Sequence, residues 1–560
     1  MTATAAGNTV NYNGAAQTLK ATTYDNLTLS GTGAKTFPSG TTTVNNVLSI
    51  ENGTNTNTFT GTLAYGTAAT LQYNAGSSNR TVAAEWPATF SGSGGVIVKG
   101  TGTITLNGAK TLSANVPLTI NSGTLASGNY NLTLGGNFTN NATFTYGTST
   151  VTFNGTSPQT ISGTSATTFY NLTINNTGTS GNNSVVLQKP TTVTNALTLT
   201  SGLVNSTVTN VLSVTNTATT AISGGSSSSF VNGPLKWSLP ASLASGSSYV
   251  FPVGAGTSYY PFTLVNPTTG TTAPTVQIEA KAGSGGGTFD GTLFSLSTTE
   301  YWTMATTGSF TNSSISISRP TAITPYNVIA GSTTVNGTYT SLGGTAGTNG
   351  VTNSNSIGSN RYFALGRARY LTLSTTSLTG FTYPEGNGPS GIQSFTVNAD
   401  GLTDNVIITS PTDFEVSLSG GTSFSGSSQI TIPIVSGGVN NVSVYVRMKA
   451  GLSQGSIGPE QLTVASTGFT NQTINLSGTV TVRPVVTLST SGLSGFTYSF
   501  SAGPSAQQSF TVSGSNLSGN ERSLHLFTMK YLLLPVPVLP RQYRSRLQEE
   551  RCRLQPFTYD

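Results

Sequence analysis

Residues 103–134 read TITLNGAKTLSANVPLTINSGTLASGNYNLTL. Pairs of aliphatic residues recur in this stretch every 14 residues, and one residue separates the two members of each pair: Ile104/Leu106, Leu118/Ile120 and Leu132/Leu134. Side chains two residues apart point to the same face of a β-strand, whereas the intervening Gly, Ser and Asn favour turns. The pattern predicts short stacked strands, as in a β-solenoid or β-roll.

A series of antiparallel sandwiches would use similar strands and is the alternative for this region. Fourteen residues are few for a three-sided coil, which needs about six residues per face in hexapeptide-type repeats. We expect solenoid-like repeats over residues 1–225 and leave the sandwich alternative open.

A longer unit also occurs twice in residues 1–225. Residues 12–19 resemble residues 153–161, and each stretch is followed by an Asn-Leu-Thr-(Leu/Ile) strand, at Asn26–Leu29 and Asn171–Ile174. Residues 42–50 then match residues 191–199. Repetition of this kind is typical of an architecture that stacks similar units.

The composition favours an all-β chain of several domains. Charged residues make up 7% of the 560 residues, against about 25% in ordinary soluble proteins, and Thr, Ser, Asn and 66 Gly fill most polar and turn positions. Low complexity often means disorder. However, 24 Phe, 21 Tyr and the alternation of apolar with polar residues predict a folded chain. The length predicts three to five domains of roughly 100–200 residues.

The distribution of charge and of reactive side chains excludes several classes of function. Cys552 and His525 are the only residues of their types, so residues 1–520 lack His-based triads, Cys nucleophiles and Cys/His metal sites. Seven of the 22 basic and four of the 16 acidic residues fall in 521–560, which leaves a net charge of +3 over residues 1–520. Nothing in this distribution indicates nucleic acid as a partner, and no run of about 18 apolar residues predicts a membrane span.

The second half of the chain changes in texture. Residues 226–369 contain Trp237, Trp302 and several prolines, which predict an antiparallel β-sandwich with a larger aromatic core. Residues 370–482 contain clean strand alternation and predict an immunoglobulin-like (Ig-like) β-sandwich. Residues 483–520 repeat the beginning of that module at a constant offset of 115, for example Gly380-Phe381-Thr382-Tyr383 as Gly495-Phe496-Thr497-Tyr498.

The repeat stops at Asn520, and residues 521–560 are predicted to be a frameshifted, non-native tail. Reading the third base of each codon with the first two bases of the next codon forces Glu at position 530 and permits Pro, Val and Ser at positions 526, 531 and 532. The first copy has Pro411, Glu415, Val416 and Ser417 at the same offset of 115. A genuine basic tail that binds an anionic partner is the alternative.

Few residues are candidates for a site. Asp400 and Asp404 could ligate calcium through oxygen donors, although Asp-Gly at 400–401 is also a turn dipeptide. Asp413 and Glu415 share one face of a strand and are interpreted as a solvated strand edge. Asp290 and Glu300 are the paired acids that a glycosidase would need, but only their being acids supports that role. We therefore expect no enzyme and no cofactor other than this candidate calcium.

Aromatic residues are the candidates for glycan binding. Tyr259, Tyr260, Trp86, Trp237 and Trp302 could stack on sugars, although Trp and Tyr are more often core residues with a polar tip. An exposed aromatic row would favour a carbohydrate-binding protein, whereas buried aromatics would favour a structural role.

Several motifs in combination resemble large secreted repeat proteins of Bacteroidota. They are the Tyr-Asn-Leu-Thr and Ala-Leu-Thr-Leu-Thr-Ser-Gly strands, Phe251–Gly254, Tyr301-Trp302, Tyr362–Gly366 and the Gly-Phe-Thr-Tyr repeats. The resemblance covers nearly all of residues 1–520 and implies an adhesin-like, non-enzymatic protein of the type IX secretion cargo type, extracellular or on the cell surface. Its partners would be surface glycans or other cell-surface proteins. The sequence shows neither a signal peptide nor a sorting domain, so we expect the chain to be a fragment.

Overall fold

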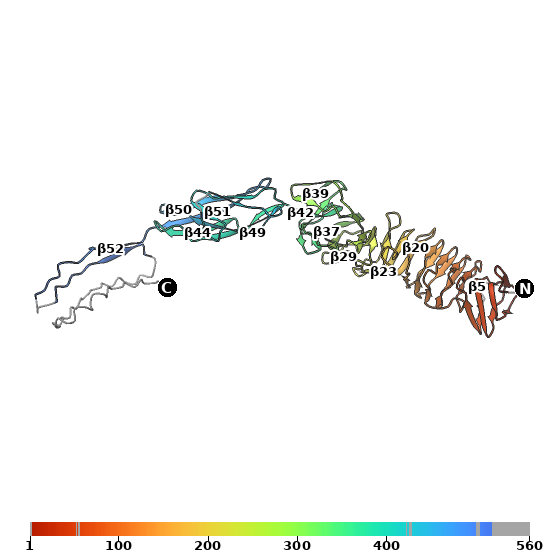
Figure 1. Ribbon diagram of the computed structural model, residues 1–560. Coiled ribbons are helices and arrows are strands. Elements are labelled where there is room, and N and C mark those ends of the chain that lie inside the picture. The colour runs from red at the N-terminus through yellow and green to blue at the C-terminus, as the bar shows by residue number, and fades with distance from the viewer. Residues whose placement is uncertain are drawn as a thin grey trace, which may run out of the picture. The chain divides into compact units, whose positions relative to one another are not determined.

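The computed structural model describes residues 3–517, apart from residues 52, 54–55, 422, 425–427 and 500–503. The described residues form strands, turns and loops without a helix, so the all-β prediction is confirmed. The chain divides into two compact units, Met1–Tyr370 with Ala399–Thr403, and Leu371–Asn398 with the residues from Asp404 onward. Figure 1 shows the strands of both units in chain order. The predicted frameshifted tail, 521–560, lies outside the described residues.

The first unit begins as a β-solenoid of about 11 turns. Its longest parallel stack has one strand from nearly every turn. The strands of this first face are β1 (Thr9–Tyr12), β3 (Thr23–Leu29), β5 (Thr41–Ile50), β8 (Thr70–Tyr73), β11 (Gly95–Val98), β14 (Leu118–Ile120), β17 (Phe138–Asn140), β20 (Gln159–Ser162), β22 (Ser184–Leu187), β24 (Leu203–Asn205), β27 (Val231–Asn232) and β30 (Val253–Ala255), with β7 (Thr62–Tyr65) beside β5 and the antiparallel β31 (Ser258–Tyr259) at the end.

Shorter stacks form the other faces of the coil. The second face contains β2 (Gln17–Thr18), β4 (Lys35–Phe37) and β6 (Thr58–Phe59), and, in a separate sheet, β9 (Arg80–Thr81), β12 (Thr103–Thr105), β15 (Thr124–Ala126) and β18 (Thr143–Thr145). The third face contains β10 (Thr89–Phe90), β13 (Lys110–Leu112), β16 (Leu132–Leu134), β19 (Thr150–Phe153), β21 (Thr167–Asn175), β23 (Thr191–Ser201), β25 (Leu212–Val214) and β28 (Leu235–Ser238), with β26 (Ile222–Gly224) beside β23. All strands in these stacks pair in parallel, so the alternative of antiparallel sandwiches is wrong for this region.

The 14-residue spacing of the aliphatic pairs is not the length of one solenoid turn. Val96 pairs with Leu118, and Leu118 pairs with Phe138, so successive turns take 22 and 20 residues. The strands β12, β14 and β16, which contain the three aliphatic pairs or end beside them, lie on three different faces. The interval of 14 residues therefore spans about two thirds of one turn. A three-sided coil is possible because each face uses a strand of only three or four residues here.

The longer repeated unit has the same local pairing in both copies. The first half of β5 pairs with β7 and its second half pairs with β8, just as β23 pairs first with β25 and then with β26. The register shifts at Tyr24/Asn26 in one copy and at Phe169/Asn171 in the other. Each copy of the sequence repeat thus encodes one long strand whose two halves pair with two separate strands of the next turn.

A glutamine within this unit closes the corner that follows the first strand. Gln17 Oε1 accepts a hydrogen bond from Gly14 N–H at 2.7 Å, and Gln159 Oε1 accepts one from Gly155 N–H at 2.9 Å. The Gln159 side chain is fully buried and also donates to the carbonyls of Leu134 and Gly136 in the preceding turn, both at 2.8 Å. Gln159 therefore ties two turns together through buried hydrogen bonds to backbone carbonyls.

Replacing Gln159 by leucine is expected to lower the free energy of unfolding by roughly 3 kcal/mol, because each buried backbone group left without a partner costs about 1–3 kcal/mol. The matched control is Gln17→Leu, since Gln17 is only half-buried and its side chain accepts from Gly14 N–H in the same corner. Denaturant unfolding of the full chain measures both changes. Equal losses for the two variants would contradict the role assigned to Gln159.

The third face passes from parallel to antiparallel pairing without interruption. β28 pairs in parallel with β25 and antiparallel with β33 (Thr275–Ala282). The sheet then continues with β36 (Glu300–Thr307), β42 (Tyr362–Ala368), β38 (Val328–Ser332), β39 (Thr338–Ser341) and β34 (Thr288–Phe289), with β35 (Leu293–Leu296) beside β42. Parallel pairing on the first face reaches β30, so the coil extends beyond the predicted limit of residue 225.

A five-stranded antiparallel sheet completes the first unit. Its strands are β29 (Ser248–Phe251), β32 (Phe262–Thr269), β37 (Phe310–Ser318), β41 (Gly350–Thr352) and β40 (Thr345–Ala346). One buried hydrophobic cluster runs from Leu19 in the solenoid to Leu365 in the antiparallel part. This shared core explains why residues 226–369 belong to the same compact unit as the coil.

The second unit contains two main sheets. One is formed by β43 (Tyr370–Leu373), β45 (Gln393–Asp400), β49 (Gly438–Met448) and β47 (Phe414–Ser417). The other is formed by β44 (Ser377–Pro384), β51 (Gln472–Thr481), β50 (Gly455–Ala465), β46 (Val406–Thr409) and β48 (Gln429–Ile432), in which β44 and β51 pair in parallel. A separate hairpin follows, formed by β52 (Val485–Leu488) and β53 (Val512–Ser515).

Candidate functional site

Uncharged hydroxyl groups form a ladder along the third face of the solenoid. Residues in register on seven neighbouring strands are Thr89, Thr111, Thr133, Thr152, Thr173, Thr198 and Ser223. None of them is buried, and neighbouring strands lie about 4.8 Å apart. The ladder therefore presents closely spaced hydrogen-bonding groups that carry no charge.

Asparagine side chains form similar contacts between turns. Asn46 Nδ2 donates to Asn26 Oδ1 at 2.9 Å, and Asn195 Nδ2 donates to Asn171 Oδ1 at 2.8 Å. These two pairs occupy the position of the register shift in the two copies of the long unit. Such ladders satisfy amide groups without charge, and they give the low-charge composition a structural role.

The solenoid interior holds an ionic cluster that the sequence interpretation missed. The Glu85 carboxylate is fully buried, and its Oε1 accepts from Ala83 N–H at 3.1 Å, lies 3.4 Å from Tyr73 Oη and lies 3.9 Å from Arg80 Nη2. Lys110 is buried nearby and donates to the carbonyl of Trp86. Glu85 Oε2 and Trp86 Nε1 are buried and have no hydrogen-bond partner. Because the cluster is closed to solvent, its role is structural.

The cluster shifts the ionisation of the groups around it. Burial, together with the Glu85 charge, raises the pKa of Tyr65 and Tyr73 well above the usual value. Burial lowers the pKa of Lys110, and the Glu85 charge partly opposes that change. Elsewhere in the first unit, burial raises the pKa of Tyr339 to about 12.

Stability is expected to fall in alkali. Phenols with raised folded-state pKa values keep protons that the unfolded chain loses above about pH 10, so the unfolding free energy decreases as the pH rises through that range. Lysines with lowered pKa values act in the opposite direction only below about pH 10.5. Denaturant titrations at stepped pH, read together with phenolate absorbance, measure the effect. A Tyr65→Phe/Tyr73→Phe variant should show a shallower fall, and an unchanged slope would contradict the assignment.

Most of the predicted glycan-binding aromatics are buried. Trp86, Trp237 and Trp302 are fully buried, and Tyr260 is 6% exposed. Trp302 Nε1 donates to the Tyr260 carbonyl at 2.9 Å, and the two rings meet edge to face. Tyr259 is half-buried against Phe230. These five residues therefore form no exposed row, which favours their role as core residues.

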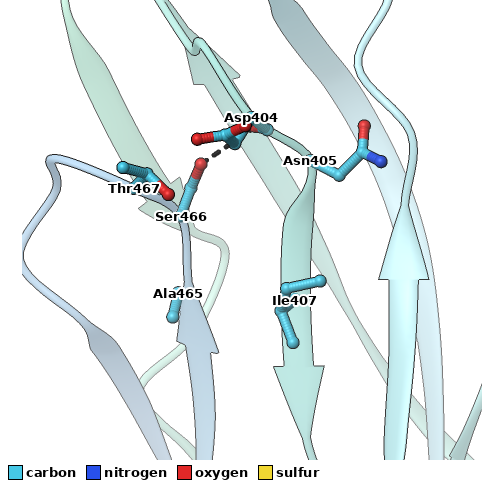
Figure 2. A pocket seen from close by; sticks show the side chains of 6 residues that line it. All are labelled: Asp404, Asn405, Ile407, Ala465, Ser466 and Thr467. Carbon is cyan, nitrogen blue, oxygen red and sulfur yellow. Dashed lines mark hydrogen bonds between the residues drawn. The ribbon is translucent and has the colours of Figure 1, made fainter.

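The two candidate calcium ligands have separate surroundings. Asp400 accepts hydrogen bonds from the guanidinium of Arg367, with Nη2 at 2.5 Å from Oδ1 and Nε at 3.0 Å from Oδ2. Asp404 lines a shallow hollow of about 370 Å³ with Asn405, Ser466 and neighbouring residues, as Figure 2 shows. The backbone carbonyl of Asp404 accepts from Ser466 Oγ at 3.0 Å. Among the residues that the structure describes, no three His, Cys, Asp or Glu residues gather into a group that could hold a metal.

The remaining acids make individual structural contacts. Asp290 Oδ1 accepts from the backbone N–H and the hydroxyl of Thr292 and closes a turn. Glu300 is fully buried and contacts Ser297 Oγ at 3.0 Å and Arg319 Nη1 at 3.5 Å.

The interpretation of Asp413 and Glu415 as a solvated strand edge is wrong for Glu415. This residue is only 8% exposed, and its carboxylate lies 2.7 Å from Arg447 Nε. β47 is an edge strand of its sheet, as expected, but the Glu415 side chain is buried there rather than solvated, because an ion pair compensates its charge.

A second hollow, of about 580 Å³, lies in the first unit. Its lining includes Asn327, Ser341, Asn355, Arg369 and Tyr370. Asn327 Oδ1 accepts from Ala368 N–H at 2.7 Å, so part of this polar lining serves the fold. This hollow is a place where binding of a neutral ligand could be tested.

Comparison with known proteins adds no assignment. No family model, curated protein or solved structure matches the chain. Within the described part of the chain, no helix has the length and apolar character needed to cross a bilayer.

Proposed function

We propose that this chain is a non-enzymatic structural and adhesive repeat protein of a bacterial cell surface, of the Bacteroidota type that its motifs resemble. The observation that carries the proposal is the stack of about 11 turns with uncharged ladders on its outer face. A continuous core and repeated backbone pairing suit a rigid spacer. The hydroxyl and amide ladders suit many weak, charge-independent contacts with a neutral surface.

The later modules support the same proposal. We infer that residues 370–482 form an Ig-like sandwich. The two sheets of four and five strands support this inference, as do buried residues that alternate along the strands, such as Phe395 and Val397 in β45 and Leu462 and Val464 in β50. Modules of this architecture occur in many cell-surface proteins.

Adhesion of beads coated with the full chain tests the proposal. We expect binding to cell surfaces or neutral polysaccharides that changes little between low and high salt, because charged contacts are screened by ions and neutral ones are not. A Thr133→Lys/Thr152→Lys/Thr173→Lys variant should bind less, whereas substitution of the exposed Val208 by lysine should not change binding. Binding that disappears in high salt would contradict the proposal. If the chain hydrolyses polysaccharides and Glu300→Gln abolishes that hydrolysis, the protein is an enzyme and the proposal is wrong.

Carbohydrate binding in a defined pocket is the second candidate. The hollow beside Asn327, Asn355 and Tyr370 favours it, because amides and a phenol are the groups that recognise sugar hydroxyls. Affinity electrophoresis in soluble polysaccharides distinguishes the two functions. Retardation that Tyr370→Ala abolishes and the threonine variant preserves would favour the pocket.

A further inference from the structure

The hairpin β52–β53 begins a second copy of the module at residues 370–482. Its strands lie 115 positions after β43 and the end of β45, and the same hydrogen bonds recur at that offset. Gln508 Nε2 donates to the Ser494 carbonyl at 2.8 Å, as Gln393 Nε2 does to the Thr379 carbonyl. Thr511 N–H donates to Ser489 Oγ at 2.8 Å, and the matching pair in the first copy is at 2.9 Å. The beginning of the second copy therefore has the same local hydrogen bonds as the first copy.

The two copies differ in what covers their apolar side chains. Phe381 is 2% exposed in the first copy, but its counterpart Phe496 is 50% exposed. Tyr383 and Tyr498 are 5% and 54% exposed, and Val397 and Val512 are 0% and 36% exposed. The same residues that form a core in one copy thus form an uncovered apolar face in the other.

The first copy shows which segment provides the cover. The Phe381 ring meets the Phe414 ring edge to face at 5.3 Å, and Tyr383 Oη donates to the Lys449 carbonyl at 2.6 Å. β44 pairs with β51, and β45 neighbours β49. All of these covering groups lie between residues 406 and 482. In the second copy, the corresponding positions begin at residue 521, where the sequence repeat stops.

We propose that the uncovered apolar face formed by Val485–Leu488, Phe496, Tyr498 and Val512 is an acceptor surface whose occupant is the remainder of its own module, encoded after codon 520 in the other reading frame. The forced Glu at position 530 matches Glu415, which is buried beside Arg447 in the first copy. The occupant is therefore a set of strands equivalent to β46–β51, and restoring the frame by one added base would start to supply it. The proposal concerns this surface alone and is independent of the adhesive function.

Three chains test the proposal. The first is the chain as it stands, and the second ends at Arg483 and lacks the second copy. In the third, the residues from position 521 onward are replaced by a copy of residues 406–482. Hydrogen exchange at the backbone amides of Leu488 and Val512 is measured in the first and third chains, which contain these residues. Binding of a hydrophobic dye is measured in all three chains. We expect the completed chain to slow exchange at these amides roughly tenfold or more and to bind dye at the level of the chain ending at Arg483.

Substitution of Phe496 provides a second test, which is useful if the second copy folds only partly in the completed chain. Phe496→Ser should leave the thermal unfolding of the original chain unchanged, since the ring is half exposed, whereas Phe381→Ser should abolish folding of the first copy. In the completed chain, Phe496→Ser should also destabilise the second copy. Unchanged exchange in the completed chain would overturn the proposal. So would concentration-dependent dimerisation of the original chain that Phe496→Ser abolishes, because the occupant would then be a second molecule. A gene that lacks the shifted repeat in the other frame would overturn it as well.

Discussion

Replacing Trp237 by alanine is expected to lower the unfolding free energy of the first unit by about 3–5 kcal/mol, the range for removal of a buried large aromatic side chain. Trp237 lies in β28, where the parallel coil meets the antiparallel sheet, and its side chain is fully buried. Its ring meets Tyr249 and Phe251 edge to face at 5.0 and 5.5 Å. The loss would therefore weaken the contact between the two kinds of β-structure within one core.

Two further variants separate the contributions of the ring and its N–H group. Trp237 Nε1 donates to the Asn216 carbonyl at 2.8 Å, so Trp237→Phe should cost less than alanine while leaving that carbonyl unpaired. Val208→Ala is the control, because Val208 is 75% exposed. Denaturant unfolding followed by fluorescence and circular dichroism provides the measurement. A loss below about 1 kcal/mol for Trp237→Ala would show that the junction repacks without this ring.

The alternation of residue types was sufficient to predict the solenoid, but the period of its coil was not. Every aliphatic pair in residues 103–134 lies inside, as expected, yet successive pairs belong to different faces. The sequence shows spacing along the chain, whereas the length of a turn depends on which strands pair in space. For the same reason, the composition of the sequence changes at residue 225, but the coil continues beyond that residue.

Buried polar residues escaped the sequence interpretation because their types are usually exposed. A local signal was nevertheless present. Lys35 and Lys110 each stand two residues before a buried Phe37 or Leu112, which places them on the inward face of their strands. Lys35 Nζ donates to the carbonyls of Gly14, Ala15 and Gly33, so the inward position is compensated by backbone acceptors. Composition alone cannot reveal such acceptors, because two of the three, Gly14 and Ala15, come from the preceding turn.

The small number of charged residues in this part of the sequence was a second signal for the buried ionic cluster. Between residues 52 and 188 the charged residues are Arg80, Glu85, Lys99 and Lys110, and three of these four are buried. The candidate binding residues, in contrast, had no pattern beyond their chemical type, and the structure gives most of them partners within the core. What the sequence predicted well was therefore the class of fold rather than a site.

Substitution of Arg80 by methionine is the second change with a large expected effect. Arg80 and Glu85 side chains are 2% and 0% exposed, and Arg80 Nη1 also donates to the Gly53 carbonyl at 3.3 Å. Removing the arginine leaves a buried carboxylate with less compensation, which costs about 3–5 kcal/mol when a buried pair is broken from one side. We expect a loss of that size in denaturant unfolding of the full chain.

A double-mutant cycle distinguishes this electrostatic cause from lost packing. Neutralising the remaining charge in Arg80→Met/Glu85→Gln should recover much of the stability, since replacing both members of a buried ion pair is often nearly neutral. Lys281→Met is the matched surface control, because Lys281 and Glu279 are 37% and 17% exposed and such pairs contribute about 0–1 kcal/mol. If the double variant is as unstable as the sum of its single variants, the Arg80–Glu85 interaction does not stabilise the solenoid interior. In that case the cost arises from the volume of the arginine side chain in the solenoid interior.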